Sequence, residues 1–146
     1  KAKYDYLKHE LQIVRGAKPG PALNGPADVS RFVHDAFPSL ANAAEERFIV
    51  IGMDHKHRVV GVAPVALGDL SSVQVPAAQV LRHVLMLPAT GFIAVHNHPS
   101  EDPLPSFEDV QVTMRMLEAG KYVGVRFLDH VIVTSDPAVF ASASST

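Results

Sequence analysis

Runs of apolar residues, separated by polar turns, predict four strands along the chain. Residues 48–51 are β-branched and aromatic, and residues 58–67 follow the polar turn 54–57, so these segments predict a β-hairpin. The continuous apolar run 91–95 is typical of a strand that is buried on both faces. Residues 125–133 predict the last strand.

Three other segments show helical spacing of apolar residues. Residues 28–36 predict a helix that Asp28 would cap and Pro38 would end, and a second helix is predicted to begin after Pro76. Ser106 is expected to open a third helix, whose predicted inward stripe is Phe107, Val110, Met114 and Leu117. Because strands and helices alternate without a regular βαβ rhythm, the pattern predicts an α/β sandwich on a mixed sheet.

The ends of the chain differ from its middle. Residues 4–14 are compatible with a short strand or a helix, and the segment 16–26 contains three prolines and three glycines, which is typical of a loop. We therefore predict an N-terminal arm and connector at 1–25, one domain at 26–140 and a flexible Ser/Ala-rich tail at 141–146.

Composition narrows the function classes. The chain of 146 residues is long enough for one domain with a real core, and its net charge of -2 gives no electrostatic reason to expect a nucleic-acid partner. It has no cysteine, which excludes disulfides, and it shows no recognisable signal peptide, so we expect a cytoplasmic location. No apolar run approaches the roughly 20 residues of a membrane helix, so no membrane partner is expected.

The segment after the buried strand carries the candidate chemistry. His96 and His98 are two residues apart at the strand end, so in an extended backbone both rings point to the same side. Asp109 follows in the first turn of the next predicted helix. Two nitrogen ligands and one oxygen ligand leave a fourth tetrahedral position for water, as in catalytic zinc sites, whereas structural zinc sites usually use thiolates. The pattern indicates metal-dependent hydrolysis.

A purely structural interpretation competes with this one. Ser106 and Asp109 also have the spacing of a helix capping pair, which alone would account for both residues. A His-x-His pair by itself is common. The combination of paired histidines at a strand end, a proline-rich connector and an aspartate in the next helix favours the metal site.

At these residues the chain resembles a known family. The pattern His-x-His-Pro, six residues, Ser, two residues, Asp is similar to the signature of the JAB/MPN (JAMM) metalloprotease superfamily. The segment 96–106 and the Leu-Asp-His motif in 128–133 resemble its RadC-like branch, and the resemblance covers roughly 28–140. It implies a JAB/MPN (cytidine-deaminase-like) sandwich, a mixed β-sheet flanked by helices.

The resemblance also implies roles for individual residues. His96, His98 and Asp109 would bind Zn²⁺, and Ser106 would help to stabilise the oxyanion. The branch pattern Glu-x-Phe selects Glu46 as the base that takes a proton from water and passes it to the leaving amine. The implied activity is that of a zinc metallopeptidase or isopeptidase acting on a protein or peptide.

Two alternatives from other classes stay open. A DNA-associated metal-dependent hydrolase or nuclease would require a basic groove, but Lys and Arg are scattered and the metal loop is acidic. A catalytically silent zinc-binding interaction domain would require neither Glu46 nor Ser106, and the chain has both.

Three further residues remain open. Glu101 stands where the RadC-like branch has Gly, so we expect a loop without a positive φ there and a side chain that faces solvent or a basic substrate group. Asp129 is a candidate for orienting a ligand imidazole. His130 is expected to be a buried, hydrogen-bonded histidine rather than a substrate contact.

Overall fold

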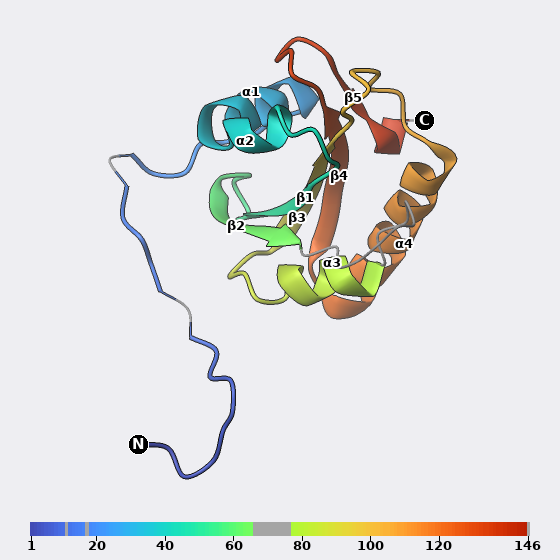
Figure 1. Ribbon diagram of the computed structural model, residues 1–146. Coiled ribbons are helices and arrows are strands. Elements are labelled where there is room, and N and C mark those ends of the chain that lie inside the picture. The colour runs from blue at the N-terminus through green and yellow to red at the C-terminus, as the bar shows by residue number, and fades with distance from the viewer. Residues whose placement is uncertain (11, 17, 66–76, 146) are drawn as a thin grey trace.

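A single mixed β-sheet forms the centre of the molecule (Figure 1). The computed structural model describes the chain except for residues 11, 17, 66–76 and 146. The strand order is β2-β1-β3-β4-β5, and β3 and β4 are parallel while the other neighbouring pairs are antiparallel. The strands are β1 (Phe48–Met53), β2 (Val59–Val65), β3 (Gly91–Asn97), β4 (Arg126–Val133) and β5 (Phe140–Ser142).

Helices cover both faces of this sheet, which confirms the predicted α/β sandwich (Figure 1). The helices are α1 (Pro26–Ala36), α2 (Pro38–Ala41), α3 (Ala77–Val84) and α4 (Phe107–Val123). α1 and α2 pack on one face and α3 and α4 on the other, so each face has its own apolar core. α1 begins two residues before the predicted cap because Pro26 suits a first helical position.

Strand β3 positions the site. All seven of its residues are buried, which confirms the prediction from the run 91–95. Successive side chains alternate between the two cores, with Val95 on the α1 side and Ala94 on the α3–α4 side. By the same alternation His96 and Asn97, at the end of the strand, face opposite sides of the sheet.

Helix α4 buries a different face from the one predicted. Phe107, Met114 and Leu117 are 72%, 64% and 45% exposed. The buried residues are Val112, Thr113, Met116 and Gly120. At Gly120 the helix comes so close to the sheet that a Cβ atom would lie 2.6 Å from a backbone carbonyl oxygen. This close approach fixes the inward face, and the predicted stripe is wrong.

The two ends of the chain also differ from prediction. In the described part of residues 1–20 there is neither helix nor strand, and the prediction for 4–14 is wrong. Residues 141–145 are not a loose tail: they complete β5 and a 3-10 turn, and Ala143 is buried. The reason is that β5 pairs with the edge of β4 and extends the sheet.

The helix predicted after Pro76 is confirmed, since α3 begins at Ala77. The predicted continuation of β2 to residue 67 lies outside the described residues. Among the helices of the described part, none is both long and apolar enough to cross a membrane.

Candidate metal centre

The end of β3 and the start of α4 bring three predicted ligands together. His96 is the second-last residue of β3, and His98 follows directly after the strand. The backbone N–H of His98 donates to the carbonyl oxygen of Val133 at 3.0 Å, which continues the pairing with β4. The backbone therefore stays extended, and both imidazoles point to the face that α4 covers. Asp109 reaches the same point from the first turn of α4.

The distances between the ligand atoms fit one metal ion. The Nε2 atoms of His96 and His98 are 3.0 Å apart. The Asp109 carboxylate places Oδ1 3.2 Å from Nε2 of His96 and Oδ2 3.1 Å from Nε2 of His98. In a tetrahedral zinc site with bond lengths of roughly 2.0–2.1 Å, neighbouring ligand atoms lie about 3.3 Å apart. The three side chains therefore have a spacing at which they could share an ion.

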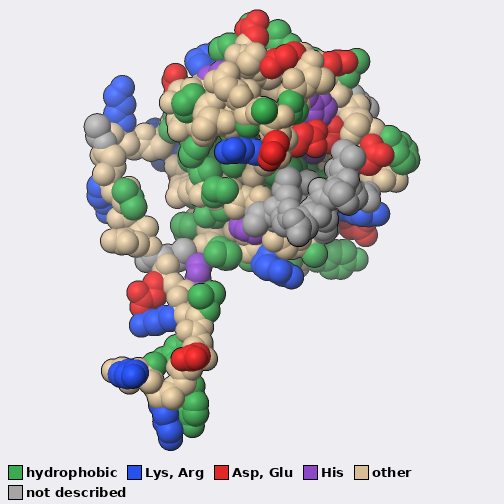
Figure 2. All heavy atoms as spheres, in the orientation of Figure 1, with side chains coloured by type: hydrophobic (Ala, Val, Ile, Leu, Met, Phe, Trp, Pro, Cys, Tyr) green, Lys and Arg blue, Asp and Glu red, His purple; other side chains and the backbone are tan. Residues whose placement is uncertain are grey.

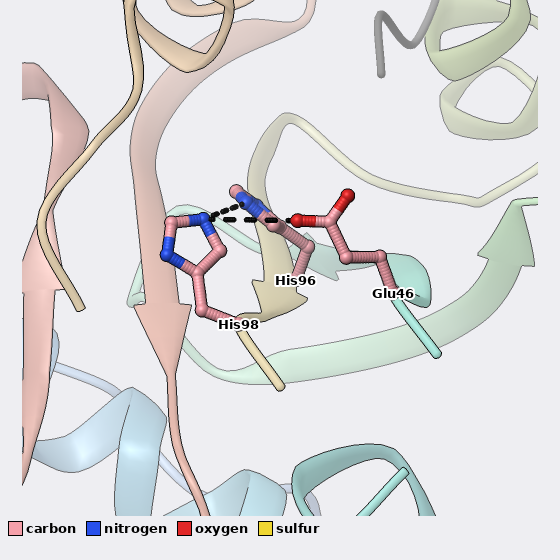
Figure 3. A group of neighbouring side chains, drawn as sticks. All are labelled: Glu46, His96 and His98. Atoms are coloured by element: carbon pink, nitrogen blue, oxygen red, sulfur yellow. Dashed lines mark hydrogen bonds and ion pairs between the residues drawn. The ribbon is translucent and has the colours of Figure 1, made fainter. Parts of the chain in front are cut away.

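Glu46 lies at the solvent side of the same cluster. Its Oε1 is 4.0 Å from Nε2 of His98, and its side chain is 43% exposed while that of His98 is 11% exposed. The ligand atoms of Glu46, His96 and His98 all lie within 4.8 Å of one another, so these three could also hold a metal ion. Figure 3 shows the side chains pointing toward one another, with His98 joined to the other two.

Ser106 caps α4, as the structural interpretation predicted. The backbone N–H of Asp109 donates to Ser106 Oγ at 3.1 Å, and the Ser106 N–H donates to Asp109 Oδ2 at 2.8 Å. Capping and metal binding do not exclude each other here, because the capping pair fixes the Asp109 carboxylate beside the two imidazoles. A hydroxyl that accepts one hydrogen bond still has its own proton to donate.

The charges of the cluster stabilise one another. Burial raises the pKa of Asp109, but hydrogen bonds with His96 and His98 outweigh burial and hold this pKa well below its usual range. The hydrogen bond with Asp109 raises the pKa of His98 above 6.5, although burial opposes this. The carboxylate therefore stays ionised, as a metal ligand must be, while protons compete with a metal for His98.

Behind the imidazoles lies a second layer of polar contacts. His130 is buried, and its Nε2 is 2.8 Å from Nδ1 of His96. Burial first, and then the neighbouring His96, lower the pKa of His130 to about 3. The Nδ1 atom of His130 lies 2.7 Å from Oγ1 of Thr113 in α4. The ring of Phe48 stacks on that of His96, with centroids 5.7 Å apart.

The expected role of His130 as a buried, hydrogen-bonded histidine is confirmed, but Thr113 was missed. The available signal is its position four residues after Asp109, which places both side chains on one face of a helix.

Asn97, between the two histidines, was also missed. It faces the opposite side of the sheet, where its Oδ1 accepts a hydrogen bond from the N–H of Arg47 at 2.7 Å. Its Nδ2 donates to the carbonyl oxygens of Ala43 and Glu45 at 3.2 and 3.0 Å. Asn97 thus holds the segment that carries Glu46. A buried polar residue in an apolar strand requires such partners, and this requirement is the signal that could have identified it.

Two other residues behave differently from expectation. Asp129 accepts hydrogen bonds from the hydroxyls of Ser142 and Ser144, both at 2.6 Å, so it anchors the C-terminal segment instead of a ligand imidazole. Glu101 has a φ of 68°, so the expectation of a loop without a positive φ is wrong. Its carboxylate accepts the N–H of Ser135 at 2.9 Å, which compensates part of the strain.

The comparisons with known proteins point to one family. The family model described as the RadC-like JAB domain matches residues 23–145. A UPF0758 protein of Halalkalibacterium halodurans is 39% identical over 74% of this chain and 45% of its own length. UPF0758 proteins of Methanosarcina mazei and Desulfitobacterium hafniense are each 34% identical, over 80% and 90% of this chain and 49% and 59% of their own lengths. The chain thus spans about half the length of these curated relatives.

Proposed function

The chain belongs to the RadC-like JAB domain family, and we propose that it is a zinc-dependent hydrolase that cleaves an amide bond, either a peptide or an isopeptide bond. The observation that carries this proposal is the convergence of two imidazoles and one carboxylate at 3.0–3.2 Å, with a second carboxylate at the exposed side. A site of this kind combines a place for a metal with a place for a base.

The division of roles follows from distance and exposure. His96, His98 and Asp109 are the proposed ligands, since their contacts are near the tetrahedral spacing of about 3.3 Å. Glu46 is the proposed base, because its oxygen is 4.0 Å from His98 and faces the exposed side, where a water molecule and a substrate can arrive. Nitrogen and oxygen donors without thiolates suit a catalytic rather than a structural zinc ion.

The proposed reaction moves one proton through Glu46. A bound zinc ion supplies Lewis acidity, which makes water acidic near neutral pH. Glu46 takes the proton of the attacking water on a carboxylate oxygen and then delivers it to the nitrogen of the leaving amine. Asn97 supports this step by fixing the backbone on both sides of Glu46 through three hydrogen bonds.

Ser106 is the proposed donor to the carbonyl oxygen of the substrate. Its Oγ accepts from Asp109 and keeps its own proton, so the helix cap and the donor role use different parts of one hydroxyl. A donor at a developing oxyanion typically accounts for about 2.7–4 kcal/mol of transition-state stabilisation.

Charge favours a protein or peptide substrate over a nucleic acid. Acidic and histidine side chains lie side by side on the face that Figure 2 presents. Phosphate backbones are bound mainly by Lys and Arg, so the exposed carboxylate of Glu46 at the site argues against the nuclease alternative. An exposed carboxylate at the rim instead suits a substrate that releases an amine.

Metal content and turnover test the proposal separately. The wild-type chain and the Glu46→Gln variant are expected to bind one zinc ion each, because Glu46 is not a ligand in this scheme. The His98→Ala variant is expected to lose it. Zinc content is measured by mass spectrometry of the purified proteins after dialysis.

Turnover is measured by comparing cell extracts treated with the wild type and with Glu46→Gln. New N-termini and lost isopeptide conjugates are identified by mass spectrometry. The expected products appear with the wild type alone. Equal products from both proteins would exclude Glu46 as the base, and cleaved nucleic acid with unchanged proteins would favour the nuclease.

A further inference from the structure

The hydrogen bonds behind His96 form a chain that returns to Asp109. Oγ1 of Thr113 lies 2.8 Å from the carbonyl oxygen of Asp109 and 2.7 Å from Nδ1 of His130. Nε2 of His130 lies 2.8 Å from Nδ1 of His96. The remaining ring nitrogen of His96 is the one that faces the candidate metal position. One residue, Asp109, therefore stands at both ends: its carboxylate at the metal position and its backbone at the start of the chain.

The side chains that form this series of hydrogen bonds are buried. Thr113 is 6% exposed, His130 1% and His96 5%. Among the described residues, no buried side-chain nitrogen or oxygen lacks a hydrogen-bond partner. Since an unpaired buried donor costs about 1–3 kcal/mol, the protons along the chain must all point in a consistent direction.

If both histidine rings are neutral, the protons along these hydrogen bonds can be arranged in two directions. In the first, Thr113 donates to Asp109 and accepts from Nδ1–H of His130, so Nε2 of His130 accepts from Nδ1–H of His96. In the second, Thr113 donates to His130, and every proton shifts by one place. The second direction puts a proton on Nε2 of His96, where it would block a metal.

The backbone carbonyl of Asp109 decides between these directions. A carbonyl oxygen can only accept, so the 2.8 Å contact with Thr113 requires the hydroxyl proton to lie between them. The oxygen of Thr113 is then left to accept from His130. Each later proton follows from the one before it, so Nδ1 of His96 carries a proton, and Nε2 is the nitrogen that can give its lone pair to a metal once any proton shared with Asp109 has left.

We propose that Thr113 and His130 are positioning residues that hold His96 in its Nδ1–H tautomer, with the Nε2 lone pair presented to the metal. The proposal rests on the proposed function in one respect, the identity of His96 as a ligand. Histidine ligands are commonly oriented by an acceptor on the other ring nitrogen, but that acceptor is usually a carboxylate, a backbone carbonyl or water. Here it is a second histidine, whose own direction is set by a helix backbone.

The arrangement couples the metal position to α4. A displacement of the first two turns of this helix would move the Asp109 carboxylate and would also break the contact that orients His96. Phe48 adds a steric constraint, because its ring lies parallel to that of His96 with an interplanar angle of 6°.

The test uses Thr113→Val, which removes the hydroxyl at nearly constant volume, and Thr113→Ser as the matched control that keeps it. The first readout is the zinc dissociation constant of the 146-residue chain, measured by competition with a fluorescent chelator. Thr113→Val is expected to weaken zinc binding about 10–100-fold, as is typical for such partners. Thr113→Ser is expected to stay near the wild-type value.

The second readout is the tautomer of His96 in the metal-free chain, from ¹⁵N–¹H correlation spectra of the ring nitrogens. The wild type is expected to carry a proton on Nδ1 of His96, whether or not Nε2 is also protonated, and Thr113→Val to show a mixture of rings with and without that proton. The wild-type spectrum needs no variant, so it decides the matter even if Thr113→Val does not fold. A wild-type His96 that carries a proton on Nε2 and none on Nδ1 would overturn the proposal, as would a folded Thr113→Val chain with unchanged zinc affinity.

The two readouts also separate this inference from the proposed function. A wild-type chain that binds no zinc but shows the Nδ1–H form would contradict the proposed function and support the positioning role. If the wild type, Thr113→Val and Thr113→Ser all bound zinc with the same affinity, that result would support the proposed function and contradict the positioning role.

Discussion

At the scale of single residues, Glu101 has a strained backbone conformation next to the metal loop. Its φ of 68° lies in the left-handed region, which costs an L-residue roughly 1–2 kcal/mol. Two hydrogen bonds oppose this cost: its N–H donates to the carbonyl oxygen of His98 at 3.0 Å, and its carboxylate accepts the N–H of Ser135 at 2.9 Å. The side chain thereby ties the metal loop to the segment after β4.

Replacement of Glu101 by Gly and by Ala should separate the strain from the hydrogen bond. Both variants lose the bond to Ser135, but only Ala keeps the cost of a positive φ. We expect Glu101→Ala to be less stable than Glu101→Gly by about 1 kcal/mol in urea unfolding. Equal stability of the two variants would show that the loop changes its backbone conformation when the carboxylate is removed.

At the scale of elements, the first turn of α4 serves both fold and site. The Oγ atom of Ser106 accepts a hydrogen bond from the N–H of Asp109, and the N–H of Ser106 donates to Oδ2 of Asp109. The hydrogen bond from the backbone N–H of residue 106 to Asp109 Oδ2 can form with any residue at this position except Pro. Substitutions can therefore remove the hydroxyl while Asp109 stays oriented.

Ser106→Gly and Ser106→Ala should differ in stability but not in catalysis. At an N-cap, Gly costs a few tenths of a kcal/mol and Ala typically about 1 kcal/mol, so Ser106→Ala is expected to have the lower unfolding free energy. Both lack the proposed oxyanion donor, so both should lose about 10²–10³ in turnover of a substrate found by the comparison with Glu46→Gln. Full turnover by the stable Gly variant would leave Ser106 with its capping role alone.

The same helix shows why the sequence predicted the site better than the packing. His96, His98 and Asp109 could be proposed because strand alternation and a short connector constrain where their side chains point. The inward face of α4 could not, because two apolar stripes compete and the choice depends on the contact of Gly120 with the sheet. Helical periodicity contains no information about which stripe meets a neighbour.

The contacts behind the proposed metal ligands could not be predicted from the sequence for a related reason. His130 contacts His96 because β3 and β4 are parallel with a particular register, and that register shifts between Phe92 and Ile93. The sequence identified His130 as a buried histidine with a hydrogen bond, but not its partner. Pairing between strands that are distant in the chain sets such contacts.

At the scale of the whole molecule, the metal position joins β1, β3, β4 and α4 through side chains or through their supports. Without a metal, the ion pair of His98 with Asp109 holds the cluster together. The pKa of His98 is raised above 6.5, so its contribution to stability is present below pH 6.5 and is lost as the pH rises through the raised pKa. The pKa of Asp109 is lowered, so its contribution is present above pH 3.8 and is lost only as the pH falls through its lowered value.

Zinc should therefore stabilise the chain more at pH 8 than at pH 6. Zinc must displace the proton of His98, and at pH 8 it replaces an ion pair that deprotonation has weakened. At a fixed free zinc concentration of 100 times the dissociation constant at pH 8, the unfolding free energy at that pH rises by about 2.7 kcal/mol, and it rises by less at pH 6, where the dissociation constant is larger. For a domain of this size this corresponds to a Tm increase of roughly 5–10 °C.

Thermal unfolding with and without a chelator at pH 6, 7 and 8 measures this increase, and His98→Ala is the control that should show none. His130 lies behind the ligands in both forms, and burial lowers its pKa to about 3, so it remains neutral over this range and cancels in the difference. If zinc raised the Tm more at pH 6 than at pH 8, zinc binding would not displace a proton from His98. An increase that persists in His98→Ala would place the ion elsewhere in the chain.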